Sequence, residues 1–448
     1  MERDRDQLGF KYLFKLFGLQ QLYKIKDVLQ RSLFVKNNFL KVLGPGIIMA
    51  GAAVGVSHLV QSTRAGAAYG FGLIALVLLI NLLKYPFFEF GPRYAIATGE
   101  SLIHGYRRTG KWAVVLFLIL TLGTMFSILA AVSTVTIGIL SSIFPNLLSF
   151  SAWTILLFGL CVAIITVGRY NALDKAMKVI IVLLTLSTLA ALAAAAWKGY
   201  NPQPQFSAAI SWSATDIAFI IALAGWMPSA IDLSVWHSLW TLAKIKQTSY
   251  TPTLREALTD FNIGYLGTVV IALAFLLLGA YTMYGSGITF SQNGTEFATQ
   301  LFELYTKHIG PWAYPLIALA AATTMFSTTL TVIDAYSRVM QPVTLMLVPQ
   351  LDQHRSIKYL RIFWTTVVIV GAFLVMTSFA NEMRLLVDIA TTLSFITAPI
   401  LGYLNYRAVT GSHVPESFRP GKWLRALSIS GLIILTAFAL YFIYTRIG

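Results

Sequence analysis

The most constraining feature of the sequence is an apolar stretch, residues 43–73, that is long enough to cross a membrane but is interrupted at its centre. Gly51, Gly55 and Gly66 break the run of large apolar side chains, and the residues from Ser57 to Arg64 are mostly polar. Irregular backbone is tolerated at membrane depth only where it is buried in protein or lines a cavity. The pattern therefore predicts an unwound joint at residues 51–57 between two half-helices, as in the binding sites of membrane transporters. The alternative is a continuous helix that uses its small residues for close packing.

The rest of the chain has the composition of a polytopic α-helical membrane protein. Of its 448 residues, 57% are hydrophobic and only 11% are charged, whereas about a quarter of a soluble domain is charged. The net charge of +15 would suggest a nucleic-acid partner in a soluble protein. Here the basic residues flank apolar runs, so no nucleic-acid partner is expected. The single cysteine, Cys161, excludes a disulfide framework and a cysteine metal site.

Eleven apolar segments of about twenty residues or more predict eleven membrane-spanning helices. Their approximate bounds are 43–70, 72–97, 112–140, 150–168, 174–198, 215–243, 260–284, 311–340, 359–380, 385–408 and 424–446.

The distribution of Lys and Arg predicts the orientation of these spans. Basic residues gather before the first span and after the second, fourth, sixth, eighth and tenth, whereas the opposite loops hold little beyond Lys198, Lys307 and Arg384. The positive-inside rule then places the amino terminus in the cytoplasm and the carboxyl terminus outside the cell (inner) membrane. Residues 1–42 are basic and aromatic and lack the core of a signal peptide, so we expect a cytoplasmic amphipathic segment there.

The sixth span is interrupted like the first. Gly225 and Pro228 lie in its middle, followed by Ser229 and Asp232. Proline lacks a backbone donor, so the helix is expected to break near Met227.

The positions of the two interrupted spans predict an internal repeat. They are five spans apart and therefore cross the membrane in opposite directions, which is the arrangement of an inverted repeat. Helices 1–5 (residues 43–198) would form the first repeat and helices 6–10 (residues 215–408) the second, with an extra helix 11 at residues 424–446.

Several stretches resemble the Nramp metal-ion transporters. LGPGIIMAG followed by AGAAYGFGL is similar to the family's first span, and AIATGESL resembles its TGKDL stretch. Ala224, Met227 and Pro228 match the A-x-x-M-P of its sixth span, and Ser327 to Gln341 resembles its eighth. The resemblance covers nearly the whole chain. It implies an all-α, LeuT-type (APC superfamily) fold of two inverted five-helix repeats, with helices 1 and 6 broken.

The chain departs from this family where the family binds metal. The family's Asp-Pro-Gly-Asn signature, whose Asp and Asn bind the ion, aligns with Gly55, Val56, Ser57 and His58. The His that follows Met-Pro in the family is Ser229 here, and the third span has no carboxylate where the family has acidic residues associated with proton movement. No divalent-metal site is therefore expected, because a dehydrated dication needs negatively charged oxygen ligands. If a dication did bind, its ligands would include His58 and Met227.

The same positions suit an anion. The second half-helices are expected to begin near Ser57 and Ser229, and helix amino termini offer free N–H groups and partial positive charge. The candidate substrate-binding residues are Gly55, Ser57, His58, Gln61, Arg64, Ala224, Met227 and Ser229.

Two of these side chains have a second interpretation. His58 would alternatively be a neutral imidazole satisfied by a backbone carbonyl. Arg64 lies six residues after His58, so on a helix it points away from that side chain. It would alternatively pair with a buried carboxylate such as Asp232 or Asp334.

Three further charged residues fall within the spans. Asp232 is either functional or part of a structural ion pair. Lys84 and Glu89 are expected to form a structural polar cluster.

Hydroxyl groups in the eighth span suggest a coupling-ion site. A sodium ion would be held there by carbonyls of the first break and by eighth-span hydroxyls, at Ala53, Val56, Ser327 and Thr328. The alternative is that these hydroxyls only make hydrogen bonds within or between helices.

Together these features predict a secondary active transporter of a small inorganic anion, with bicarbonate as first choice. Alternating access would be coupled to a cation, and sodium is favoured over protons because the third span lacks carboxylates. The alternatives are a divalent-metal (Mn²⁺, Fe²⁺ or Mg²⁺) transporter of altered selectivity and a transport-inactive membrane sensor or scaffold. No enzyme motif is present, and no cofactor is expected beyond sodium as coupling ion. The expected partners are the transported ion and the lipid bilayer. The oligomeric state is left open, and a monomer is one of the alternatives.

Overall fold

The computed structural model describes residues 42–167, 170–197, 210–285, 289–351, 354–379 and 381–447. The predicted amphipathic segment at 1–42 lies almost entirely outside the described residues, as does Lys198. Every regular element in the described part is a helix. The elements are α2 (Pro45–Ala53), η1 (Ser57–Ser62), α3 (Thr63–Tyr69), α4 (Ile74–Thr98), α5 (Leu102–Thr109), α6 (Lys111–Ile143), α7 (Phe150–Val167), α8 (Tyr170–Trp197), α9 (Ala214–Gly225), α10 (Leu233–Thr248), α11 (Leu254–Met283), α12 (Gly294–Ile309), η2 (Pro311–Ala313), α13 (Tyr314–Leu347), η3 (Pro349–Leu351), α14 (His354–Ser378), α15 (Met383–Thr410), η4 (Glu416–Phe418) and α16 (Lys422–Ile447).

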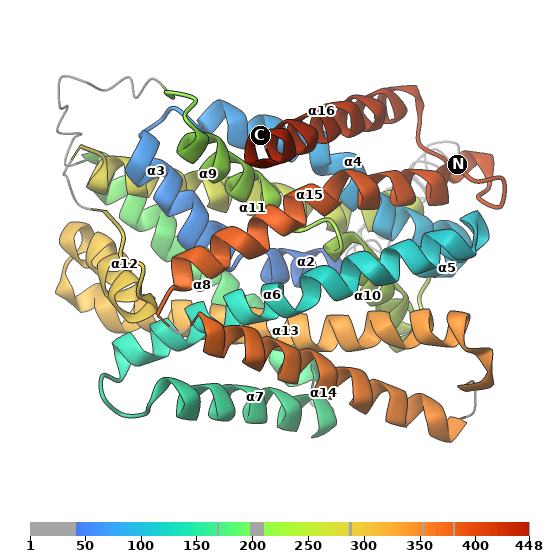
Figure 1. Ribbon diagram of the computed structural model, residues 1–448, viewed down its shortest axis with the longest axis horizontal. Helices are drawn as coiled ribbons and strands as arrows, with labels where there is room; N and C mark the ends of the chain where they lie inside the picture. Colours follow the sequence, from blue (N-terminus) through green and yellow to red (C-terminus); the bar gives the residue numbers. More distant parts are fainter. Residues whose placement is uncertain are drawn as a thin grey trace, which may run out of the picture.

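The long helices lie side by side along the longest axis of the molecule (Figure 1). In that view α7 and α14 run along one edge and α16 along the other, while α2 lies near the centre. Many large apolar side chains on the outer helices are exposed, for example Ile155, Leu266 and Ile433. Such a surface suits contact with lipid rather than water.

The predicted spans correspond to helices of the structure. Within the described residues, seven helices are long and apolar enough to cross a membrane, and the bent pair Pro45–Ala53 and Ser57–Tyr69 makes an eighth span. Three shorter apolar helices overlap the predicted fourth, fifth and sixth segments. The total of eleven spans therefore stays a prediction. Helices α5 and α12, which are 8 and 16 residues long, were not predicted from the sequence.

The amino end of α2 is fixed by a carboxylate from another helix. Pro45 occupies the first turn of α2, where a missing N–H costs no hydrogen bond. The backbone N–H groups of Gly44 and Gly46 donate to the two carboxylate oxygens of Asp260, in α11, at 3.0 and 2.6 Å. An acidic group at a helix amino terminus is favourable because of the helix dipole.

Close backbone contact joins α3 to α11. A Cβ atom on Gly66 would lie 1.8 Å from the carbonyl oxygen of Leu276, and one on Gly279 would lie 2.3 Å from that of Thr63. Small residues at such crossings let two membrane helices approach until their backbones touch. These two glycines therefore set the position of the half-helix that follows the first break.

We expect Gly66→Ala to lower the free energy of unfolding by roughly 1–3 kcal/mol, because the added methyl group forces α3 away from α11. Thermal unfolding of the purified protein in detergent measures the effect. Gly123→Ala in α6 is the control, since no atom lies within 4 Å of its added Cβ. Equal melting temperatures for the two variants would contradict this packing.

Candidate functional site

The first break is shorter than the sequence predicted. Helix α2 continues to Ala53, and the chain is unwound only at Val54 and Gly55, because Val56 already has helical dihedral angles before η1 begins at Ser57. The two half-helices meet at an angle of 49°. A Cβ atom on Gly55 would lie 3.1 Å from the side chain of Thr328, in α13, so the break packs tightly against the eighth span. The expected joint at 51–57 is confirmed at its centre and corrected at both ends, because Gly51 and Ser57 are helical.

The second break separates α9 from α10. Helix α9 ends at Gly225, and a Cβ atom there would lie 1.8 Å from the Thr391 carbonyl oxygen of α15. A cis peptide bond joins Met227 to Pro228. Helix α10 begins at Leu233, so the expectation that the second half begins near Ser229 is wrong by about one turn. The chain around Ser229 is instead extended and turned, which leaves more unwound backbone in this span than in the first.

A buried lysine from α4 occupies the second break. The Lys84 ammonium group donates to the carbonyl oxygens of Ala224, Gly225 and Ser229, at 2.7, 2.8 and 3.3 Å. Its side chain is completely buried. The last carbonyls of a helix have no partner within it and carry partial negative charge, so a cation there is favourable. Lys84 thus caps α9 and does not form the expected cluster with Glu89, which pairs with Arg93 at 2.5 Å.

Asp232 balances the charge of Lys84. It lies just before α10, and its carboxylate accepts a hydrogen bond from the Tyr336 hydroxyl of α13 at 2.8 Å. Lys84 and Asp232 also attract each other electrostatically. Asp334 lies elsewhere on α13 and pairs with Arg338 and Arg361, at 2.5 and 2.7 Å.

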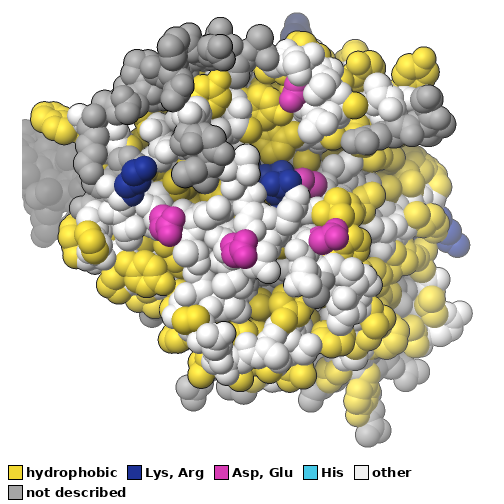
Figure 2. Space-filling view, turned by 60° about the vertical axis from the view of Figure 1, so that its left-hand side comes forward, with side chains coloured by type: hydrophobic (Ala, Val, Ile, Leu, Met, Phe, Trp, Pro, Cys, Tyr) yellow, Lys and Arg dark blue, Asp and Glu magenta, His cyan; other side chains and the backbone are white. Residues whose placement is uncertain are grey.

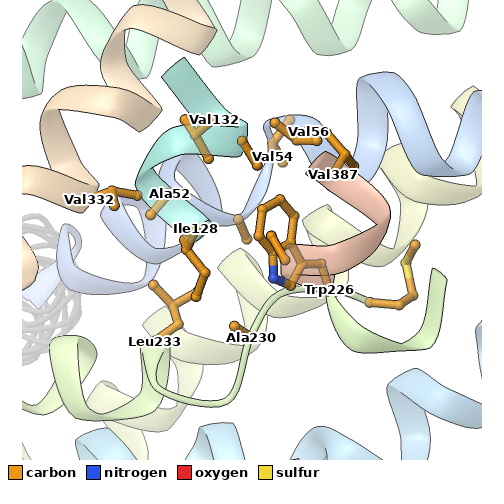
Figure 3. Close-up of a cluster of buried hydrophobic side chains, with 14 of the residues drawn as sticks. Ala52, Val54, Val56, Ile128, Val132, Trp226, Ala230, Leu233, Val332 and Val387 are labelled. Carbon is orange, nitrogen blue, oxygen red and sulfur yellow. The ribbon is translucent and has the colours of Figure 1, made fainter. Parts of the chain in front are cut away.

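A small pocket of about 30 Å³ lies between the two breaks. A cavity of roughly this size holds a single water molecule. Its polar side chains are Ser57, Ser229 and Thr328, and no carboxylate is among its lining residues. The apolar lining comes from α2, the first break, α6, α10, α13 and the second break, and the indole of Trp226 lies among these side chains (Figure 3). The lining is Ala52, Ala53, Val56, Ser57, Ile128, Val132, Trp226, Ser229, Ala230, Leu233, Trp236, Thr328 and Val332.

His58 is fully buried and has a partner on each ring nitrogen. Its Nε2 lies 3.0 Å from the Thr268 carbonyl oxygen, and its Nδ1 lies 2.6 Å from the Ser57 hydroxyl. Because a carbonyl can only accept, Nε2 carries the proton, and in the neutral ring Nδ1 accepts from Ser57. The Ser57 hydroxyl also lies 2.8 Å from the Ala53 carbonyl oxygen. In this conformation the imidazole therefore points to α11 and fixes Ser57, and it does not line the central pocket.

Gln61 and Arg64 face α15 instead of the pocket. Arg64 forms two hydrogen bonds to the Asp388 carboxylate, at 2.6 and 3.0 Å. Gln61 accepts from Arg64 at 2.6 Å and donates to Asp388 at 3.1 Å. Arg64 does pair with a carboxylate, as the second interpretation expects, but the partner is Asp388 and not Asp232 or Asp334.

The remaining predicted residues lie around the breaks. The Gly55 carbonyl accepts from the amides of His58 and Leu59, and the Ala224 carbonyl accepts from Lys84. Met227 is buried but is not among the side chains that line the pocket. Among the described residues no three His, Cys, Asp or Glu side chains come together in a way that could hold a metal ion.

Three of the four expected sodium ligands line the same pocket, namely Ala53, Val56 and Thr328. The Thr328 hydroxyl lies 3.0 Å from the carbonyl oxygen of Thr324 and 3.5 Å from that of Gly51. The first of these is a bond within α13, as the alternative interpretation expects. Ser327 is buried and does not line the pocket.

We expect His58→Ala to lower the melting temperature more than His58→Gln does. Alanine leaves the Thr268 carbonyl without a donor and Ser57 without its ring partner, whereas glutamine keeps both a donor and an acceptor. Loss of a buried hydrogen-bond partner costs about 1–3 kcal/mol. Thermal unfolding in detergent compares the two variants, and equal stability would show that these hydrogen bonds do not hold the first break.

Comparisons with known proteins agree with this fold. Residues 46–445 match the family described as natural resistance-associated macrophage protein-like (Nramp). An uncharacterized protein of Pasteurella multocida is 37% identical over 413 residues, which are 91% of this chain and 92% of that protein. A manganese transporter of Eremococcus coleocola has a TM-score of 0.67 at 13% identity, with 92% of this chain and 88% of that chain covered. The structure of MhsT in complex with L-phenylalanine has a TM-score of 0.57 at 14% identity, covering 90% and 97% of the two chains.

The predicted LeuT-type fold, with two broken helices, is confirmed by these structures. The match to the family extends over nearly all of the chain. The protein therefore belongs to the Nramp family and is a multi-pass membrane transporter rather than an enzyme.

Proposed function

We propose that this transporter carries a small inorganic anion, with bicarbonate as first choice, by alternating access coupled to a cation gradient. The single observation that carries the proposal is the Lys84 ammonium at the broken sixth span, where it binds the Ala224 carbonyl at 2.7 Å. A transported cation at the crossing of the two broken helices would need such carbonyl oxygens.

Lys84 disfavours a divalent cation in two ways. It already occupies three carbonyl oxygens of the second break, and its charge repels a dication. A single and a double positive charge about 5 Å apart repel by roughly 7 kcal/mol at an effective dielectric constant of 20. Asp232 offsets part of this repulsion, but its carboxylate is bound to Tyr336 and does not line the pocket.

The pocket presents hydroxyl groups to a substrate, and Ser57 would have to turn its hydrogen away from His58 to donate to an anion. The hydroxyl of Ser57 and that of Ser229 lie on opposite breaks and face the same cavity. At the amino end of η1 the amides of His58 and Leu59 are held by the Gly55 carbonyl, so this end contributes mainly the positive end of its dipole. When the two breaks move apart enough to admit it, a planar oxyanion such as bicarbonate can accept hydrogen bonds from these hydroxyls, and no lining carboxylate repels it.

The coupling cation is proposed to be sodium. Helix α6 has no carboxylate along its whole length, so it offers no acidic proton carrier. The backbone at Ala53 and Val56 and the Thr328 hydroxyl offer neutral oxygen atoms on the α13 side of the first break. Rearrangement there would release Thr328 from its bonds within α13 and expose these oxygens to sodium.

A divalent metal is the second candidate, because a solved structure with this fold is named a manganese transporter. The identity to that protein is only 13%. Manganese would have to displace Lys84 from the carbonyls of the second break, or bind on the side of Asp232 that faces away from Lys84. Met227 would be a soft ligand in either case.

Uptake into proteoliposomes separates the two candidates. We expect radiolabelled bicarbonate to accumulate in the presence of an inward sodium gradient, and manganese to enter no faster than into empty liposomes. Manganese uptake without bicarbonate uptake would overturn the proposal in favour of the second candidate.

We expect Lys84→Met to reduce bicarbonate uptake at least 10-fold, because methionine keeps much of the volume and removes the charge. Arg108→Gln is the matched control, since this arginine forms only an exposed pair with Glu100. Melting temperatures show whether the variant is folded. A folded Lys84→Met protein that transports bicarbonate at the normal rate would remove the lysine from the mechanism.

A further inference from the structure

A second, much larger cavity lies apart from the central pocket. Its volume is about 870 Å³, and it is bounded by α3, α9, α15, α16 and the chain at residues 289–292. We call it the vestibule. Figure 2 shows the end of the molecule to which α3 runs, where a few acidic and basic side chains lie among hydrophobic and uncharged ones. The vestibule lining is Arg64, Ala67, Ala68, Tyr69, Thr215, Ala218, Phe219, Thr289, Phe290, Gln292, Arg384, Leu385, Asp388, Ile389, Thr392, Leu393 and Phe442.

The vestibule is too large for the proposed substrate alone. Cavities of about 300–1,000 Å³ with apolar walls and a few convergent polar groups are typical of sites for organic small molecules. Here the apolar wall includes Phe219, Phe290 and Leu393. A ligand that fills this space must therefore carry an apolar body.

The charged groups of the vestibule are two arginines and one aspartate. Arg384 donates to the Phe290 carbonyl oxygen at 3.0 Å, and no carboxylate of the described residues lies within ion-pair distance of it. Arg64 and Arg384 are close enough to interact electrostatically, as are Arg384 and Asp388. Among the lining residues, a single carboxylate therefore interacts with two guanidinium groups. The lining as a whole carries an excess positive charge beside its apolar wall.

The geometry around Arg64 is already that of a carboxylate receptor. Its guanidinium holds both oxygens of Asp388, at 2.6 and 3.0 Å, and lies 5.0 Å above the ring of Phe219. Gln61 donates a further hydrogen bond to the same carboxylate. Two parallel N–H···O bonds of this kind select planar carboxylates.

We propose that the vestibule binds an amphipathic monocarboxylate, with its acid group at Arg384 and Arg64 and its apolar body against Phe219 and Leu393. Asp388 competes with the ligand for Arg64. The ligand bridges α3 and α15, which are the elements that the Arg64–Asp388 pair now joins. This inference does not depend on which ion the transporter carries.

The test is isothermal titration calorimetry of the full-length protein in detergent with 4-phenylbutyrate at neutral pH. The neutral amide 4-phenylbutyramide has the same apolar body, and acetate has the same acid group. We expect the acid to bind at least 10-fold more tightly than either. Equal affinity for the acid and the amide would overturn the proposal, because the arginines would then contribute nothing.

Variants locate the site. Arg384→Gln should weaken 4-phenylbutyrate binding at least 10-fold, and Leu393→Trp should weaken it by filling the apolar wall. Asp388→Asn should strengthen it severalfold, since the competing carboxylate is lost. Lys307→Gln removes a charge outside the vestibule lining and should change nothing.

Unchanged binding in both Arg384→Gln and Leu393→Trp would contradict the site. Weaker binding in Asp388→Asn would contradict the competition. Melting temperatures in detergent confirm that each variant is folded, and Leu393→Trp reports on the site even if Arg384→Gln does not fold.

Discussion

The structure depends on how the carbonyl groups at the second break are satisfied within a membrane. Ending a helix at membrane depth leaves carbonyl oxygens without partners, and each costs several kcal/mol in hydrocarbon. Lys84 meets this requirement for Ala224, Gly225 and Ser229 with a single buried ammonium group. Asp232 compensates the charge of Lys84, and the Tyr336 hydroxyl donates a hydrogen bond to the Asp232 carboxylate. Four elements, α4, α9, α10 and α13, are in this way tied together at the centre of the protein.

The first break is stabilised differently, and the difference is informative. Here neutral groups suffice: His58 links Ser57 to the Thr268 carbonyl, and Gly55 packs against Thr328. Asp260 caps the start of α2 from α11. The pocket between the two breaks is therefore lined by no charged side chain. Its polar side-chain groups are hydroxyls and the two tryptophan indoles. This lining supports the proposal of an anionic substrate, which rests on the Lys84 ammonium at the second break.

Much of the fold could be predicted from the sequence because apolar runs and glycine–proline interruptions are local signals. The position of both breaks follows from Gly55 and Pro228 in this way. Partners distant in sequence are not encoded locally, so the Arg64–Asp388 pair was missed and Lys84 was assigned to a cluster with Glu89. The sequence does show a lysine within the second span and an aspartate early in the tenth. A charged side chain at membrane depth needs a partner, so both residues could have been recognised as paired. His58 shows the same limit, since only the folded chain places Thr268 beside its ring.

We propose that the crossing of the two broken helices accepts negative rather than positive charge. X-ray diffraction at the manganese absorption edge, from crystals grown with both manganese and bicarbonate, tests this sign of charge. We expect no anomalous peak between the breaks, and density for a planar anion between Ser57 and Ser229 with Lys84 still bound to the Ala224 carbonyl. A strong manganese peak coordinated by that carbonyl and Met227, with Lys84 displaced, would contradict it.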